Sequence, residues 1–155
     1  MSDPYAGDGA VDPVSPAASG VYVESSGTYA SSIDAAVTGL YVKWAYDAGC
    51  ATAAPAALPI VVMIHGYPDF SGSWTYLTPK LNDGYRVGAL DTRGYNLSSQ
   101  PVGVENYEMP KLVADVDAVI KAEGYTTATV LGHDWGGSIA WMYAFAHPEK
   151  LDNLI

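Results

Sequence analysis

The segment Gly132-His133-Asp134-Trp135-Gly136 places one acidic side chain between two small residues, at the expected junction of a strand and a helix. Glycines on both sides of Asp134 permit a turn so tight that a Cβ atom would clash there. Such a turn presents its middle side chain at the end of the strand. The helix N-terminus lies behind that side chain, and its backbone N–H groups favour negative charge. The spacing therefore predicts that Asp134 is a nucleophile.

An aspartate in this position favours alkyl transfer over acyl transfer. The reference pKa of aspartate is about 3.9, so Asp134 is expected to be ionised at neutral pH without a neighbouring base. Attack of a carboxylate on an ester would give a reactive anhydride. Displacement at a saturated carbon instead gives an ester that water can later hydrolyse.

A second motif, His65-Gly66-Tyr67-Pro68, directly follows a strongly apolar stretch. Gly66 allows close approach of the backbone to a ligand, and the N–H groups of Tyr67 and Trp135 are expected to form an oxyanion hole. These donors would stabilise the tetrahedral intermediate when the covalent ester is hydrolysed. Tyr67, Pro68 and Trp135 are expected to contact substrate, His65 is expected to be structural, and the Tyr67–Pro68 bond is a candidate cis peptide.

A third motif runs from Asp91 to Ser98 after another expected strand. Asp91 and Arg93 are expected to brace the loops by an ion pair and backbone hydrogen bonds. Asn96 tolerates a positive φ better than most residues. Tyr95 and Tyr107 are interpreted as surface or packing residues.

The elements that would position these motifs alternate along the chain. Strands are expected at 21–23, 40–46, 59–65, 85–90, 127–132 and 151–155, and helices at 71–81 (or 73–81), 108–123 and 136–146. This alternation predicts an α/β fold with a mostly parallel, doubly wound sheet and flanking helices. Ligands bind such sheets outside the carboxyl ends of the strands.

Hydrophobic periodicity predicts which faces are buried. In the strand at 40–46, the side chains of Leu40, Val42 and Trp44 are expected to lie on one face. The helix at 136–146 is apolar nearly all round and is expected to be deeply buried, with Trp141 in the core. In the helix at 108–123 the apolar stripe is Leu112, Val116, Val119 and Ile120, and the opposite face is Asp115, Asp117 and Lys121.

Composition excludes several classes of protein. The 155 residues carry 17 acidic and 7 basic side chains, and the net charge of −10 argues against nucleic acid or an anionic membrane as a partner. Cys50 is the only cysteine, which excludes an internal disulfide.

The first residues lack the pattern of a signal peptide, so a cytoplasmic location is expected. Residues 1–19 are predicted to be a flexible leader.

Together the motifs resemble the α/β-hydrolase fold family and, within it, the epoxide hydrolases. His65–Pro68 is similar to the His-Gly-x-Pro motif of that group, Asp91–Ser98 to its Asp-x-Arg-Gly-Tyr-Gly-x-Ser loop, and Gly132–Gly137 to its nucleophile segment. The resemblance covers about residues 40–155. It implies a partial α/β-hydrolase fold, truncated after the nucleophile helix, with residues 20–155 forming the N-terminal part of the domain.

The resemblance also implies a mechanism for a small-molecule epoxide substrate. Asp134 attacks an epoxide carbon to form an alkyl-enzyme ester, a histidine activated by an acidic residue drives water onto that ester, and two lid tyrosines polarise the epoxide oxygen. Neither a metal nor an organic cofactor takes part. In the family the histidine and the lid follow the nucleophile, and only 21 residues follow Asp134 here. The expected partner is therefore the missing C-terminal half of the hydrolase domain.

Three alternatives remain. Haloalkane dehalogenases also use such an aspartate, although they commonly carry asparagine where this chain has Tyr67, which favours an epoxide. The chain could instead be a non-catalytic fragment, remnant or binding module of α/β-hydrolase ancestry. It could also be an incomplete gene model or one half of a split enzyme.

Overall fold

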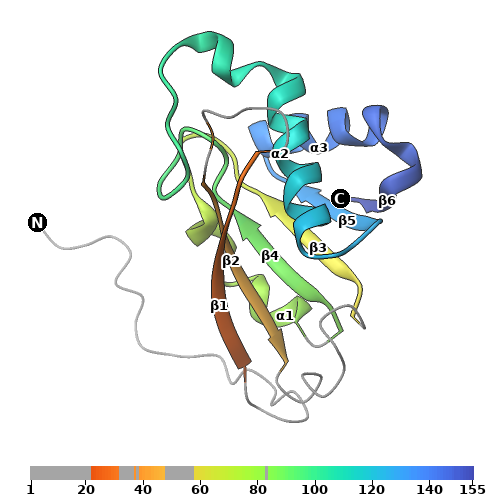
Figure 1. The fold of residues 1–155 in the computed structure, drawn as a ribbon. Coiled ribbons are helices and arrows are strands. Elements are labelled where there is room, and N and C mark those ends of the chain that lie inside the picture. The colour runs from red at the N-terminus through yellow and green to blue at the C-terminus, as the bar shows by residue number, and fades with distance from the viewer. Residues whose placement is uncertain (1–21, 32–36, 38, 48–57, 83) are drawn as a thin grey trace, which may run out of the picture.

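A six-stranded sheet forms the centre of this computed structural model, which describes residues 22–31, 37, 39–47, 58–82 and 84–155 (Figure 1). The strands are β1 (Tyr22–Tyr29), β2 (Leu40–Asp47), β3 (Ile60–Ile64), β4 (Arg86–Leu90), β5 (Ala128–Gly132) and β6 (Leu151–Leu154). Their order across the sheet is β1-β2-β4-β3-β5-β6. The pairs β4–β3, β3–β5 and β5–β6 are parallel, whereas β1–β2 and β2–β4 are antiparallel. The predicted mostly parallel α/β sheet is confirmed.

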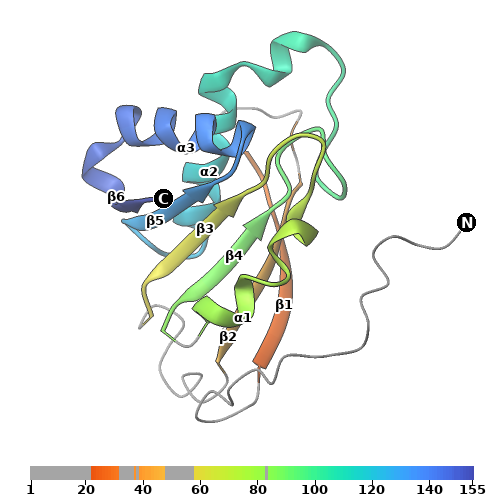
Figure 2. The same ribbon diagram turned by 180° about the vertical axis from the view of Figure 1, so that it is seen from behind.

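Helices cover both faces of the sheet. Figures 1 and 2 show α2 (Met109–Ala122) and α3 (Trp135–Ala146) on one face and the short α1 (Thr78–Leu81) on the other. Because β3 lies between them, all five of its residues are buried, as its continuous apolar sequence predicts. In the part of the chain that the structure describes, no helix combines the length and apolar character needed to cross a bilayer.

Some boundaries differ from the sequence prediction. The first strand reaches Tyr29 because it pairs along its whole length with β2. The single helix expected to end at Leu81 is divided into a 3-10 helix (Ser71–Trp74) and α1, where Pro79 lies in the first turn. Proline is suited to the first turn of a helix and not to its interior, so Pro79 starts a new helix. The predicted leader at 1–19 and most of the loop at 50–58 lie outside the described residues.

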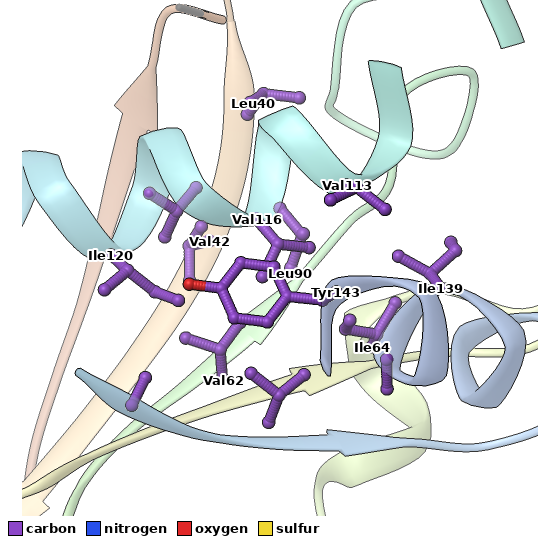
Figure 3. Packing of buried hydrophobic residues seen from close by; sticks show 14 of the residues in the cluster. Leu40, Val42, Val62, Ile64, Leu90, Val113, Val116, Ile120, Ile139 and Tyr143 are labelled. Atoms are coloured by element: carbon purple, nitrogen blue, oxygen red, sulfur yellow. The ribbon is translucent and has the colours of Figure 1, made fainter. Parts of the chain in front are cut away.

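The larger part of the core lies between the sheet and the pair α2 and α3 (Figure 3). Leu40, Val42 and Trp44 all face it, as the alternation in that strand predicts. Figure 3 shows Tyr143 of α3 surrounded by side chains from the strands and from α2. These labelled neighbours include Val42, Val62, Ile64, Leu90, Val116 and Ile120.

The predicted solvent face of α2 is wrong at two positions. Asp115 and Asp117 are 2% and 6% exposed, because each has a cationic partner from elsewhere in the fold. Asp115 is paired with Arg93, and Asp117 is paired with Lys150 and Lys121. Carboxylates are tolerated in the interior only when they are paired in this way.

The prediction that α3 is buried on all sides is also wrong. Gly136, Ile139, Ala140 and Tyr143 are its buried residues. Trp141 and Phe145 are 59% and 73% exposed, and their rings lie 6.0 Å apart between centroids. The helix therefore carries a second apolar face that points away from the sheet.

Candidate active site

Asp134 lies at the junction of β5 and α3 in a strained backbone conformation, with φ 56° and ψ −120°. The neighbouring glycines explain how the turn closes. A Cβ atom on Gly136 would lie 2.1 Å from the carbonyl oxygen of Ile64, and one on Gly132 would lie 2.3 Å from the carbonyl oxygen of Gly136. Both contacts are with backbone atoms, so no larger residue fits without moving the main chain. The tight turn expected around Asp134 is present.

The carboxylate of Asp134 is exposed and accepts a backbone hydrogen bond from the loop after β3. The N–H of Tyr67 donates to Oδ1 at 2.9 Å. This bond, the adjacent N–H of Trp135 and the nearby His133 hold the pKa of Asp134 below its ordinary value. The structure thus places the N–H groups of Tyr67 and Trp135 close to Asp134, and they favour the charged form of its carboxyl.

Close approach of the loop after β3 explains why a glycine precedes Tyr67. A Cβ atom on Gly66 would lie 2.6 Å from the Cβ of Asp134 and 3.0 Å from the carbonyl oxygen of His133. Gly66 therefore lets the N–H of Tyr67 reach the carboxylate. The Tyr67–Pro68 peptide bond is cis, as the sequence suggests.

His65 is buried and joins this loop to the loop after β4. Its Nε2 accepts the N–H of Thr92 at 3.1 Å, so the ring hydrogen is on Nδ1, which lies 2.8 Å from the carbonyl oxygen of Gly66. With both ring nitrogens engaged in this way, His65 positions the backbone next to Asp134.

Asp91 and Arg93 stabilise the loop after β4 through separate partners. Asp91 accepts the backbone N–H of Ser71 at 2.7 Å and the side-chain amide of Asn96 at 2.8 Å. Arg93 does not form the ion pair expected within the loop, since its Nε and Nη2 each lie 2.6 Å from an oxygen of Asp115. A fully buried guanidinium needs such a two-point partner, and α2 supplies it. Asn96 adopts φ 44°, the positive value that its sequence position suggested.

A pocket of about 210 Å³ opens beside Asp134. It is lined by His65, Gly66, Thr92, Arg93, Tyr95, Tyr107, Leu112, Trp135 and Ile139. Of the three residues expected to contact substrate, Trp135 is part of this wall, whereas Tyr67 and Pro68 are exposed outside it. The cavity is mainly apolar and aromatic. Asp134 is not one of its lining residues, but it directly precedes Trp135 and its Cβ lies 2.6 Å from the Cβ position of Gly66, both of which line the cavity.

Tyr95 and Tyr107 both line this pocket, although their sequence context indicated surface or packing residues. The ring of Tyr95 lies edge-on to His65, with centroids 5.0 Å apart. The available signal was its position in the loop after β4, because β4 is adjacent to β3 and the loops after both strands meet at one edge of the sheet. Tyr107 is mainly a packing residue, since its hydroxyl donates to the carbonyl oxygen of Pro101 at 2.8 Å.

The geometry at Asp134 predicts a low titration midpoint for its side chain. We expect the carboxyl carbon of Asp134 to titrate below 3.8, the ordinary value, because two N–H donors stabilise its charged form. The stability that these bonds contribute is then present above pH 3.8 and is lost as pH falls through the depressed pKa. A carbon-13 NMR titration of the folded chain measures this midpoint, and a value at or above 3.8 would contradict the hydrogen-bonded geometry.

Residues 59–155 match the family model described as alpha/beta hydrolase fold. Epoxide hydrolase 1 of Caenorhabditis elegans is 46% identical over 97 residues, which cover 63% of this chain and 24% of that protein. Epoxide hydrolase 4 of Homo sapiens is 39% identical over 97 residues, which cover 63% of this chain and 27% of that protein. The chain thus spans about a quarter of the length of these curated relatives.

Solved structures of epoxide hydrolases also match this chain over part of their length. An epoxide hydrolase from an endophytic Streptomyces superposes with a TM-score of 0.70 at 31% identity, covering 86% of this chain and 36% of that one. Epoxide Hydrolase A from Mycobacterium thermoresistibile gives a TM-score of 0.68 at 29% identity, covering 86% and 38%. In these neighbours, the region that matches the described sheet and helices is a little over a third of a longer chain.

Proposed function

The chain belongs to the alpha/beta hydrolase fold family, and on this premise we propose that it opens an epoxide ring through a covalent ester on Asp134. The observation that carries the proposal is an exposed carboxylate in a strained turn, to which the N–H of Tyr67 donates and whose pKa the adjacent N–H of Trp135 also lowers. The similarity to proteins named epoxide hydrolases supports the choice of substrate class.

The two N–H donors suit both halves of this reaction. In the first half, the N–H of Tyr67 holds Oδ1 of Asp134 while the carboxylate attacks the epoxide carbon. A C–O bond of the ring then breaks, and its electron pair goes to the epoxide oxygen. In the second half, water adds to the carboxyl carbon of Asp134 itself, so negative charge develops on an oxygen that the same donors can stabilise.

We propose that hydrolysis of the ester needs a base from further polypeptide. The chain has three histidines. His65 is engaged at both ring nitrogens, and His147 follows the twelve-residue helix α3, about 18 Å from its start. His133 directly precedes Asp134 and acts on its carboxyl electrostatically, but among the described residues its ring makes no hydrogen bond to that carboxyl.

The outer face of α3 indicates where that polypeptide would lie. Trp141, Met142 and Phe145 are all exposed there, and grouped apolar side chains of this size commonly mark an interaction surface. We propose that the remaining part of a hydrolase domain covers this face and supplies the base, since the 97 matched residues are only 24% and 27% of the two relatives' lengths.

Covalent capture followed by mass spectrometry tests the proposal. The purified chain, incubated with styrene oxide, is expected to gain one adduct, mapped by peptide analysis to Asp134, without steady formation of diol. Absence of any adduct at Asp134 would overturn the epoxide function. Sustained diol formation over many turnovers would overturn the requirement for further polypeptide.

A further inference from the structure

The strand β1 forms one edge of the described sheet, and β6 forms the other (Figures 1 and 2). The β6 edge is four residues long, carries the exposed Asp152 and pairs with β5 in an irregular register. β1 is eight residues long and pairs with β2 in one unbroken register. Glu24 is its one charged residue, and it contains neither lysine nor proline. β1 therefore lacks most of the features by which edge strands avoid pairing with another chain.

The hydrogen bonds of β2 show which main-chain groups of β1 point outward from the sheet. The N–H of Tyr41 donates to Oγ of Ser98 at 2.8 Å, and its carbonyl oxygen accepts the N–H of Asp91 at 2.9 Å. Both acceptor and donor follow β4, so Tyr41 directs its main-chain groups toward β4 and away from β1. Thr28, which lies opposite Tyr41, is therefore in a non-hydrogen-bonded pair, and its own N–H and C=O point away from β2.

Every second residue of β1 shares this orientation, because the ladder with β2 has no register shift. The outward groups belong to Tyr22, Glu24, Ser26 and Thr28. Within the part of the chain that the structure describes, no backbone group or side chain pairs with them on that side. Such a row of evenly spaced donors and acceptors is what a further antiparallel strand needs.

The end of β1 at Tyr29 is fixed to two other elements. The Tyr29 hydroxyl accepts Nε1–H of Trp44 at 2.7 Å and donates to the carboxylate of Glu123. Trp44 is a buried residue of β2, and Glu123 follows the last turn of α2. The edge is thus held in its extended conformation before any partner binds, which lowers the entropic cost of adding a strand.

We propose that a second copy of this chain adds its own β1 to this edge, antiparallel, about a two-fold axis at Ser25. In this register Tyr22 of each copy pairs with Thr28 of the other. Glu24 pairs with Ser26, so the two carboxylates do not lie directly opposite one another, where like charges are destabilising. Every outward residue is then hydrogen-bonded, whereas an axis at Glu24 or Ser26 leaves some of them beyond the end of the partner strand. This self-complementarity favours a second copy over an unrelated peptide.

Cysteine cross-linking tests this register. In a Cys50→Ser background, Ser25→Cys brings two thiols to a non-hydrogen-bonded pair on the axis, where Cα atoms lie about 4.5 Å apart and a disulfide fits. The matched variant Ser26→Cys places its thiols across a diagonal, with Cα atoms about 8 Å apart, which is too far for a disulfide. We expect mild oxidation to give the covalent dimer at least about tenfold faster with Ser25→Cys, measured on non-reducing gels.

Sedimentation velocity tests the association without a cross-link. We expect the chain with its natural β1 to form a dimer whose fraction rises with concentration. Ser26→Pro removes an outward N–H without removing a bond to β2, so it should weaken the dimer by about tenfold or more. Ser26→Ala retains that N–H and should leave the dimer unchanged, and circular dichroism checks that both variants are folded.

Three results would each overturn the proposal. One is a natural chain that stays monomeric at every concentration. Another is a dimer that Ser26→Pro leaves as strong as before, since it would form through a different surface. The third is cross-linking of Ser26→Cys as fast as that of Ser25→Cys, which contradicts a two-fold axis at Ser25 even if Ser26→Pro fails to fold.

Discussion

Replacing Asp134 by asparagine is expected to abolish ester formation with styrene oxide, lowering its rate by more than about 1,000-fold. A neutral amide is a far weaker nucleophile than a carboxylate, and residues 132–136 contain no other carboxylate. The fold should persist, because asparagine tolerates the positive φ of 56° and its side-chain oxygen can still accept the N–H of Tyr67. Intact-mass and peptide mass spectrometry over time measure the effect.

Asp152→Asn provides the matched control for this prediction. Asp152 is an exposed carboxylate on β6, so the same change of charge there should leave the adduct on Asp134 unaffected. Circular dichroism of both variants checks that they are folded. An Asp134→Asn chain that still gains the adduct at the parent rate would show that the ester forms at another residue.

The turn around Asp134 is predictable from sequence because its requirements are local. The small residues on each side, the apolar strand before them and the helix after them all lie within a short stretch of chain. The same reasoning applies to Gly66, whose need for a small side chain follows from the approach of two adjacent strand ends. In the structure, a Cβ atom on Gly132 or Gly136 would clash with backbone atoms. A Cβ atom on Gly66 would clash with Asp134.

Features that depend on distant partners are not predictable in this way. Asp115 has the periodicity of an exposed helical position, but Arg93, 22 residues earlier in the chain, pairs with it in the interior. The helix α3 is apolar on both sides, so its composition does not show which side meets the sheet. Tyr95 lies in a loop without periodicity, and its place at the pocket depends on the relative positions of β3 and β4.

The largest effect on stability is expected from Gly136→Ala. The added Cβ would lie 2.1 Å from the carbonyl oxygen of Ile64 and 2.6 Å from that of His65. These atoms belong to β3 and the loop after it, so relief of the clash must move a fully buried strand away from the turn. We expect a loss of about 3 kcal/mol or more in the free energy of unfolding, measured by urea denaturation.

Gly137→Ala is the adjacent control that separates this clash from a general effect of alanine in the helix. A Cβ on Gly137 meets its nearest atom, the carbonyl oxygen of Gly132, at an ordinary 3.5 Å. Alanine also favours the helix by up to about 1 kcal/mol, so this variant should be as stable as the parent or slightly more so. Equal urea midpoints for the two variants would mean that β3 and the turn do not approach as closely as described. In that case the N–H of Tyr67 could not be held against Asp134, and the geometry on which ester formation depends would be lost.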